Sequence, residues 1–337
     1  MPFPGTVEIL GRSPQIAELR EQIRVIAPTS APVLLRGETG TGKSLVARVI
    51  HQLSRRSGGA FVAFSAANLQ EQLFESELFG HVKGAFSGAL ADHHGLARAA
   101  DGGTLFLDEI GELTAANQAR LLHFLDNREV RPVGSTRSWE VDVRIVCATN
   151  RTLDDEVRQR RFRQDLFFRL NVVHLTVPPL RERPGDVVLL AEHFLATFCA
   201  RHGKSHARLR PEAVALLTQH PWPGNVRELA NEVERAVVLT PSGEPIGPDH
   251  LSPRLRGRTL AAGDAGADPL GRARRQAERR LILQVLGDTG WNVSAAAREL
   301  GMSRVGLCKK LKRLGVARPA SFDERSRPLS EQHGSGY

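Results

Sequence analysis

A glycine-rich stretch holds the first residues whose types and spacing suggest chemistry. It follows an apolar run at residues 33–36, typical of a strand, and precedes a segment with apolar residues at helical spacing. In such a strand–loop–helix unit, backbone N–H groups and the helix N-terminus can bind phosphate oxygens. The stretch matches the pattern GxxxxGK[ST] with Gly37, Glu38, Thr39, Gly40, Thr41, Gly42, Lys43 and Ser44. We therefore predict a nucleotide-phosphate site; the alternative is an ordinary glycine-rich turn with a chance lysine.

Charged and hydroxyl side chains in and after this stretch predict the chemistry of the site. Lys43 should reach the β and γ phosphates, and Ser44 offers a hydroxyl to Mg²⁺. An apolar strand at residues 102–107 runs into Asp108 and Glu109, which would lie beside the phosphate loop in a parallel sheet. Asp108 would hold Mg²⁺ together with Ser44, partly through water, while Glu109 orients or deprotonates the attacking water. The predicted cofactors are ATP and Mg²⁺, and the predicted reaction is ATP hydrolysis.

Four more polar residues are expected to act on the phosphates. Asn150 follows an apolar strand at residues 143–148, and Arg227 begins a helix that can close over the nucleotide. Arg163 and Arg169 lie in an arginine-dense segment, in which they either form a solvated basic face or reach the γ-phosphate of a neighbouring subunit.

The elements that must position these residues have an alternating pattern. Four apolar strands separated by helical stretches predict a three-layer α/β fold with a largely parallel sheet. The apolar pattern then becomes helical, which predicts a small lid, and a Gly-, Ala-, Pro- and Arg-rich stretch typical of a linker follows. The predicted organisation is an α/β subdomain at 1–178, a helical lid at 179–252, a linker at 253–268, an all-α domain at 269–317 and a disordered tail at 318–337.

A loop of small residues at 80–89 has Phe86 at its centre, between glycines. An exposed aromatic side chain at a flexible hairpin tip is costly unless it meets a partner. The loop is therefore predicted to be a contact element.

The net charge of +9 is concentrated towards the C-terminus. Residues 252–318 contain 15 Lys and Arg against 5 Asp and Glu, a surplus of +10, so the remainder sums to about −1. This distribution favours a nucleic-acid-binding module on a nearly neutral enzyme over a solvated basic tail.

Two short helices with the spacing of a helix-turn-helix are predicted in this basic region, after a longer helix at 268–286. Asn292 can cap the first and Ser303 the second, with Gly301 in the turn. A plain helical hairpin is the alternative. With the leucines of the second helix facing inward, the residues available to DNA are Ser303, Arg304, Val305, Lys309, Lys310 and Arg313.

The composition of the chain argues against several other classes of protein. The chain of 337 residues is long enough for two or three domains, and no apolar run approaches the ~20 residues that span a bilayer. Cys147, Cys199 and Cys308 are scattered, which indicates neither a disulfide framework nor a zinc site. We expect a soluble cytoplasmic protein with no membrane partner. Because the phosphate loop begins so early, we also expect no regulatory domain before it, and control by a partner protein, by ligand or by expression level.

With these motifs assembled, the chain resembles the AAA+ bacterial enhancer-binding proteins, which activate transcription by the sigma-54 form of RNA polymerase. The likeness extends from about Leu10 to Ala317. It is carried by ELFG at 77–80 and GAFSGA at 84–89, FRQDLFFRLN at 162–171, PPLRER at 178–183 and WPGNVREL at 222–229.

The resemblance implies a role for each matching residue. Lys43 and Ser44 would belong to Walker A, Asp108 and Glu109 to Walker B, Asn150 to sensor I, Arg227 to sensor II, and Arg163 and Arg169 would be trans-acting arginine fingers. The residues that would contact the sigma factor are Gly84, Ala85, Phe86, Ser87, Gly88 and Ala89, with Phe86 as the key contact. The resemblance further implies a ring, commonly a hexamer, with ATP at the subunit interfaces, and a Fis-type domain that binds upstream DNA.

The chain departs from the family pattern at four positions. Ser87 replaces a usual threonine, which keeps the hydroxyl and loses a methyl group. Ser65 stands where family members carry an asparagine that restrains the Walker B glutamate. His93 and Arg98 replace a usual arginine and glutamate after the loop.

Two functions fit these observations. The first is a sigma-54-dependent activator that binds upstream DNA and hydrolyses ATP to remodel the closed RNA polymerase–promoter complex. The second is a DNA-binding regulator that uses the AAA+ module only as a nucleotide-dependent oligomerisation switch. A helicase or clamp-loading motor would leave the Phe86 loop and the helix-turn-helix unexplained.

Overall fold

The computed structural model describes residues 8–67, 71–205, 208–256, 282–304, 306–307 and 311. The chain forms two compact units, Met1–Arg258 and Thr259–Tyr337. Within the described ranges, no helix combines the length and the apolar character needed to cross a membrane. The start of the helix expected at 268, most of the expected linker and the expected tail at 318–337 lie outside the described residues.

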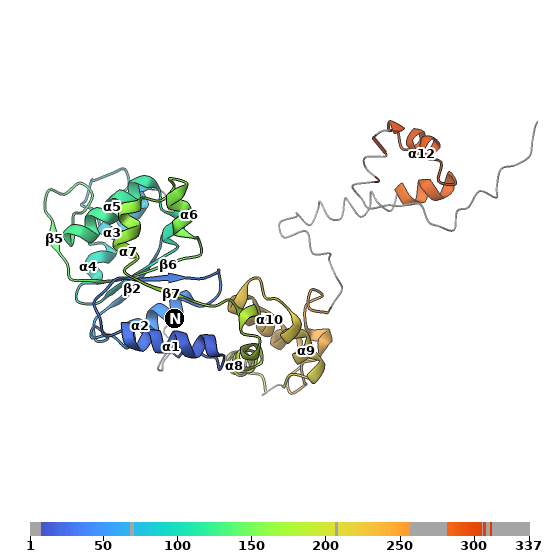
Figure 1. The fold of residues 1–337 in the computed structure, drawn as a ribbon, viewed down its shortest axis with the longest axis horizontal. Helices are drawn as coiled ribbons and strands as arrows, with labels where there is room; N and C mark the ends of the chain where they lie inside the picture. Colours follow the sequence, from blue (N-terminus) through green and yellow to red (C-terminus); the bar gives the residue numbers. More distant parts are fainter. Residues whose placement is uncertain are drawn as a thin grey trace, which may run out of the picture. The chain divides into compact units, whose positions relative to one another are not determined.

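A five-stranded parallel sheet forms the centre of the first unit (Figure 1). Its strands are β1 (Val33–Arg36), β2 (Phe61–Ser65), β3 (Thr104–Asp108), β6 (Arg144–Thr149) and β7 (Val173–Thr176). They pair in the order β2-β3-β6-β1-β7, and every neighbouring pair is parallel. The four strands expected from the sequence are confirmed, and β7 is an additional edge strand. Because all pairs are parallel, β1, β3 and β6 end at the same edge of the sheet.

Helices cover both faces of the sheet (Figure 1). The helices α1 (Pro14–Ile26) and α2 (Lys43–Gln52) lie on one face, and α3 (Glu71–Phe79), α5 (Ala115–Asn127) and α7 (Gln164–Leu170) lie on the other. Successive residues of β1 point to opposite faces, so Leu34 packs with the second group of helices and Leu35 with the first. This two-sided burial explains the continuous apolar strands. The predicted three-layer α/β fold is confirmed.

Short elements extend the connections between strands and helices. The 3-10 helix η1 (Ile110–Glu112) begins directly after β3, and α6 (Leu153–Arg158) begins soon after β6, so both start at the edge where these strands end. The other short elements are α4 (Leu96–Ala99), β4 (Glu129–Val130), β5 (Trp139–Glu140), η2 (Leu180–Glu182) and η3 (Pro248–His250).

Three helices form the predicted lid around a buried tryptophan. They are α8 (Gly185–Arg201), α9 (Pro211–Gln219) and α10 (Asn225–Leu239). Trp222 lies in the turn before α10, is 0% exposed, and donates from Nε1 to the Leu217 carbonyl oxygen at 2.8 Å. Its ring packs within the apolar core that these helices share, and its one polar group is satisfied.

Polar contacts attach the lid to the phosphate loop. The Glu38 carboxylate accepts hydrogen bonds from both terminal nitrogens of Arg181, at 2.8 and 2.6 Å, and from Asn225 Nδ2 at 3.1 Å. Asn225 is 0% exposed, and its Oδ1 accepts from the Leu180 N–H at 2.8 Å. Hydrogen bonds from Arg181 first, and from Asn225 second, hold the pKa of Glu38 below its usual value. The second residue of the phosphate loop is thus bound directly to the lid.

In the second unit the structure describes α12 (Val293–Glu299) and the residues on either side of it, from 282 to 304, 306–307 and 311. Asn292 Oδ1 accepts from the backbone N–H groups of Ser294 and Ala295 at 3.1 and 3.2 Å, which confirms the predicted cap. Ser303 Oγ accepts from the Gly306 N–H at 3.1 Å, as predicted for the second cap. A separate apolar core is formed by Ile282, Val285, Leu286, Ala296, Ala297 and Leu307.

Removing the buried indole should destabilise the lid strongly. Trp222→Ala leaves a large cavity in the apolar core, and we expect the free energy of unfolding to fall by about 3–5 kcal/mol. Urea denaturation followed by far-ultraviolet circular dichroism measures the change. Val238→Ala, at a side chain that is 51% exposed in the same lid, is the control and should cost less than about 0.5 kcal/mol. Equal unfolding midpoints for the two variants would contradict the assignment of Trp222 as the centre of the lid core.

The contact between Glu38 and Arg181 should contribute a pH-dependent share of stability. Because the folded-state pKa of Glu38 is lowered, its contribution is present above the unfolded-state pKa and is lost as the pH falls through the folded-state pKa. Glu38→Gln should therefore reduce the free energy of unfolding at neutral pH by up to about 1 kcal/mol, since the pair is solvent-screened.

The measurement is urea denaturation of both proteins at neutral and acidic pH. The difference between wild type and Glu38→Gln should shrink as the solution becomes acidic. Glu192→Gln, at an exposed position of α8, is the matched control and should show no such trend. A difference that stays constant with pH would exclude an ionic contribution of Glu38.

Candidate functional site

The phosphate loop joins β1 to α2 with the geometry that its glycines require. Gly40 and Gly42 have φ values of 81° and 104°, in the left-handed region that disfavours side chains. A Cβ atom on Gly40 would also lie 2.3 Å from the Gly224 carbonyl oxygen of the lid. Lys43 is 6% exposed, and its ammonium group donates to the Gly37 carbonyl oxygen at 2.9 Å. The lysine therefore lies folded back over the loop.

The two predicted carboxylates face this loop, with Asp108 as the last residue of β3 and Glu109 directly after it. Asp108 Oδ2 accepts from the Ser44 hydroxyl at 3.4 Å, so two oxygen donors of the kind that Mg²⁺ prefers lie together. Glu109 Oε1 lies 3.6 Å from Lys43 Nζ. Glu109 has a φ of 55°, a strained left-handed conformation for a residue with a side chain. This conformation turns the Glu109 carboxylate towards the loop.

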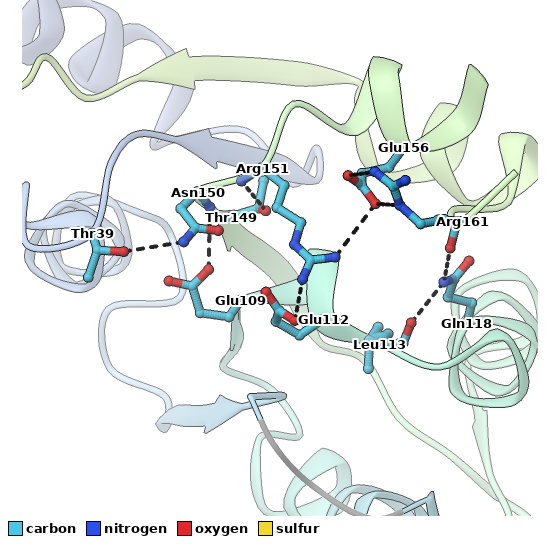
Figure 2. Close-up of polar contacts among 10 residues, drawn as sticks. All are labelled: Thr39, Glu109, Glu112, Leu113, Gln118, Thr149, Asn150, Arg151, Glu156 and Arg161. Carbon is cyan, nitrogen blue, oxygen red and sulfur yellow. Dashed lines mark hydrogen bonds and ion pairs between the residues drawn. The ribbon is translucent and has the colours of Figure 1, made fainter. Parts of the chain in front are cut away.

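Asn150, which directly follows β6, contacts both Glu109 and the phosphate loop (Figure 2). Its backbone N–H donates to Glu109 Oε2 at 3.3 Å, and its Nδ2 donates to Thr39 Oγ1 at 3.2 Å. Ser65 stands where family members carry the asparagine that restrains the Walker B glutamate. It is the register partner of Asp108 in the sheet. In this structure the Glu109 carboxylate contacts Lys43 and Asn150.

A pocket of about 290 Å³ lies between the phosphate loop and the lid. Arg227, the predicted sensor II residue, lines it, and its backbone N–H donates to the Gly40 carbonyl oxygen at 3.2 Å. Apolar side chains that we did not predict as site residues also line it, namely Leu45, Phe194, Val226 and Ala230. The only sequence signal for Phe194 was an apolar helical stripe, which is typical of a core as well. The full lining is Thr39, Gly40, Gly42, Lys43, Ser44, Leu45, Asp108, Glu109, Phe194, Val226, Arg227 and Ala230.

Arg163 and Arg169 lie at the two ends of α7, with side chains 48% and 51% exposed. Arg163 makes two contacts with the Asp165 carboxylate, at 3.1 and 2.8 Å. Arg169 Nε lies 3.1 Å from Asp126 Oδ1. Between them Phe168 is 63% exposed. Both guanidinium groups are thus presented on the surface of their own subunit, each beside one carboxylate, and Arg169 Nη2 also donates to the Leu125 carbonyl oxygen at 3.4 Å.

The predicted contact loop forms a tight hairpin tip. The Gly84 N–H donates to the Ala89 carbonyl oxygen at 2.9 Å, and the Ala89 N–H donates to the Phe86 carbonyl oxygen at 3.1 Å. The expectation that Phe86 is exposed is wrong in this conformation. Its ring is half-buried and packs edge-on against His81, with ring centroids 5.0 Å apart. The most exposed large apolar side chain near the tip is instead Leu90, at 85%.

The base of this loop is tied to the rest of the domain. His81 and His93 exchange two backbone hydrogen bonds, at 2.9 and 2.8 Å. The Val82 N–H donates to the Val133 carbonyl oxygen at 3.1 Å, which joins the loop to the hairpin that contains β4 and β5. Arg98, a departure from the family pattern, lies over the Trp139 ring of that hairpin at 4.3 Å from its centroid.

The predicted DNA-contacting residues are only partly described. Ser303 caps the helical turn that follows it, and Arg304 is exposed beside it. Val305, Lys309, Lys310 and Arg313 lie outside the described residues.

Three family descriptions match successive parts of the chain. Residues 9–176 match the Sigma-54 interaction domain, residues 181–267 match the AAA+ ATPase lid domain, and residues 273–314 match the bacterial regulatory proteins of the Fis family.

Curated relatives match over nearly the whole chain. The regulatory protein AtoC of Escherichia coli (strain K12) is 44% identical over 313 residues, which cover 91% of this chain and 68% of the relative. The transcriptional regulatory protein ZraR of the same strain is 47% identical over 306 residues, covering 90% and 68%. The response regulator protein PilR of Pseudomonas aeruginosa is 45% identical over 318 residues, covering 93% and 71%.

Solved structures of NtrX from Brucella abortus share the fold. The structure in complex with ATP has a TM-score of 0.71 and 35% identity, covering 92% of this chain and 70% of NtrX. The structure in complex with ADP has the same TM-score and identity, covering 93% and 70%. The chain therefore belongs to the family of sigma-54-dependent transcriptional activators, which are AAA+ ATPases that carry a Fis-type DNA-binding domain.

Proposed function

We propose that the protein binds upstream DNA, assembles into a ring with ATP at the subunit interfaces, and uses ATP hydrolysis to remodel the closed complex of sigma-54 RNA polymerase with its promoter. The observation that carries this proposal is the position of Glu109. Its carboxylate lies between Lys43 and the backbone of Asn150, in a pocket that the lid covers. This arrangement suits a group that orients a water molecule against a bound γ-phosphate.

Each residue around the pocket has its own role in ATP hydrolysis. The phosphate loop binds the phosphates through backbone N–H groups, and Lys43 moves from the Gly37 carbonyl oxygen to the β and γ phosphates. Ser44 and Asp108, whose oxygens lie 3.4 Å apart, would hold Mg²⁺, partly through water. Such an ion would supply positive charge against the phosphates. Asn150 holds Glu109 and Thr39 in a fixed relation, and Arg227 senses the nucleotide from the lid.

Arg163 and Arg169 act on the ATP of the neighbouring subunit. Both are half-exposed at the ends of α7. Arg163 is held by the exposed Asp165 carboxylate, and Arg169 by the exposed Asp126 carboxylate and the Leu125 carbonyl oxygen; each can leave these contacts for a phosphate. An arginine supplied in trans stabilises the charge of the transition state. This role requires a homo-oligomer, and a hexameric ring satisfies it by closing every interface.

The loop at residues 84–89 contacts the sigma factor, with Phe86 as the main apolar side chain. The contact requires Phe86 to leave the ring of His81, since the two pack together in the described conformation. ATP hydrolysis at the opposite edge of the sheet supplies the free energy for this exposure. The Fis-type domain, with Arg304 exposed beside its cap, holds the ring near the promoter. A protein with these partners works in the cytoplasm.

Replacing Glu109 with glutamine should separate ATP binding from ATP hydrolysis. The amide keeps the size of the side chain but cannot act as a base, so we expect kcat to fall at least about a hundredfold while ATP affinity is retained. Phosphate release and equilibrium binding of a fluorescent ATP analogue measure the two effects. Hydrolysis at the wild-type rate would show that another group activates the water.

Replacing Phe86 with alanine should separate ATP hydrolysis from transcription activation. We expect Phe86→Ala to hydrolyse ATP normally and to lose open-complex formation on a sigma-54 promoter, because the apolar contact is missing. Leu53→Ala, at an apolar side chain that is 50% exposed on the α2 side of the sheet, is the matched control. If wild type represses transcription without forming open complexes, the second hypothesis, a nucleotide-dependent oligomerisation switch, holds instead.

A further inference from the structure

A closed circuit of polar contacts lies between the Walker B segment and the start of α7 (Figure 2). Its members are Glu112, Leu113, Gln118, Arg151, Glu156 and Arg161. Glu112 comes from η1, Gln118 from α5 and Glu156 from α6, while Arg151 lies two residues after β6 and Arg161 lies between α6 and α7. None of these residues was predicted to be functional from the sequence.

Gln118 fixes the backbone on both sides of Phe162. The Gln118 side chain is buried, and its Oε1 accepts from the Arg163 N–H at 2.8 Å. Its Nε2 donates to the Arg161 carbonyl oxygen and to the Leu113 carbonyl oxygen, both at 2.9 Å. One amide group therefore ties the backbone of Arg163 to the residue that follows η1. Phe162 itself is 3% exposed in the core, which prevents the segment from turning about these bonds.

Glu156 closes the circuit through two arginines. Its carboxylate accepts from Arg161 Nε and Nη2 at 2.7 and 2.6 Å, a paired geometry that favours a defined orientation. The same carboxylate lies 3.5 Å from Arg151 Nη1. Arg151 Nη2 in turn donates to Glu112 Oε2 at 2.5 Å. Arg161 first, and Arg151 second, hold the pKa of Glu156 below its usual value, so the carboxylate is charged at neutral pH.

This circuit adjoins the ATP site of the same subunit. Arg151 directly follows Asn150, whose backbone N–H donates to Glu109 and whose side chain donates to Thr39. The Arg151 N–H donates to Thr149 Oγ1 at 3.0 Å, so the backbone that leaves β6 is fixed. Glu112 lies in η1, which begins directly after Glu109. A shift of Asn150 is therefore transmitted to Arg151 over one residue, and a shift of Glu109 to Glu112 over three.

We propose that Gln118, Glu156 and Arg161 are positioning residues that set the place of Arg163, and that Arg151 and Glu112 make this place depend on the nucleotide in the same subunit. The inference rests on the proposed role of Arg163 as a trans-acting arginine. A subunit then offers its arginine to the neighbour's ATP only when its own site holds Glu109 and Asn150 in the matching arrangement. By this route, the state of one ATP site affects hydrolysis at the next site around the ring.

The effect on the reaction follows from geometry. Arg161 holds the backbone only two residues before Arg163, and a misplacement of a catalytic group by about 1 Å can cost roughly a hundredfold in rate. Loss of the Arg161 side chain should leave ATP binding intact, because Arg161 is not among the residues that line the nucleotide pocket.

The first test replaces Arg161 with glutamine in the full-length chain. Its side chain is 53% exposed, so the substitution should be tolerated by the fold. We expect kcat for ATP hydrolysis to fall about ten- to a hundredfold with KM for ATP unchanged. The matched control is Arg158→Gln, which removes a guanidinium group from the same segment whose partner is the exposed Asp155 at 3.0 Å. The control should hydrolyse ATP at the wild-type rate.

The second test asks whether Arg161→Gln impairs the action of Arg163 on the neighbouring subunit or the ATP site of its own subunit. Arg161→Gln subunits keep an intact ATP site, and Glu109→Gln subunits keep the Arg163 side chain together with the Gln118, Glu156 and Arg161 contacts that position it. Mixing the two inactive proteins should restore hydrolysis above the sum of the separate activities, because a mixed interface in one of its two orientations pairs the working site of an Arg161→Gln subunit with the working arginine of a Glu109→Gln subunit. Glu156→Gln should be rescued in the same way. Its matched control is Asp155→Asn, which changes the neighbouring carboxylate of α6 and should hydrolyse ATP at the wild-type rate without mixing.

The outcomes distinguish this inference from the proposed function. Wild-type hydrolysis by Arg161→Gln and Glu156→Gln, or a folded variant that Glu109→Gln does not rescue, would overturn the positioning role. Arg163→Ala in parallel tests the proposed function, since removal of a trans-acting arginine should cost roughly a thousandfold in kcat. If Arg163→Ala retains full activity, the assignment of the arginine itself fails, and the positioning role fails with it.

Discussion

Parallel pairing of β1, β6 and β3 is the constraint on which the site depends. In a parallel sheet the strands end at the same edge, so the residues that follow them meet although they are far apart in the sequence. The phosphate loop follows β1, Glu109 follows β3, and Asn150 follows β6. The contacts of Glu109 with Lys43 and Asn150 exist only because these three strands are neighbours. An antiparallel strand at any of these places would send one of the groups to the opposite edge.

The same pairing produces a second group of neighbours behind the first. η1 begins where β3 ends and α6 begins soon after β6 ends, so Glu112 and Glu156 lie on either side of Arg151. Gln118 brings in the segment before α7 by hydrogen bonds to its backbone. The ATP site and the proposed trans-acting arginine are therefore served by one continuous set of polar contacts, in which each charged group faces an opposite charge.

The two parts that move in the proposed function, the lid and the contact loop, are each held by a small number of contacts. The lid is attached to the phosphate loop through Glu38 and Asn225, so a change in the loop acts directly on the lid. The contact loop is held by the pairing of His81 with His93 and by the packing of Phe86 on His81. A Cβ atom on Gly134 of the adjoining hairpin would lie 2.9 Å from the Ala85 Cβ, which shows how closely the two segments approach. Movement of the loop therefore requires it to separate from that hairpin.

The sequence by itself determined the candidate phosphate-binding groups and their order along the chain. The pattern at 37–44, the carboxylates after an apolar run, and the caps at Asn292 and Ser303 depend on local backbone geometry, so they could be predicted from neighbouring residues. The tertiary structure alone decided which distant groups meet. The roles of Gln118 and Glu156 could not be predicted, because their partners come from other elements and no motif marks them. Phe86 was wrongly expected to be exposed, since its burial depends on where the fold places the His81 ring.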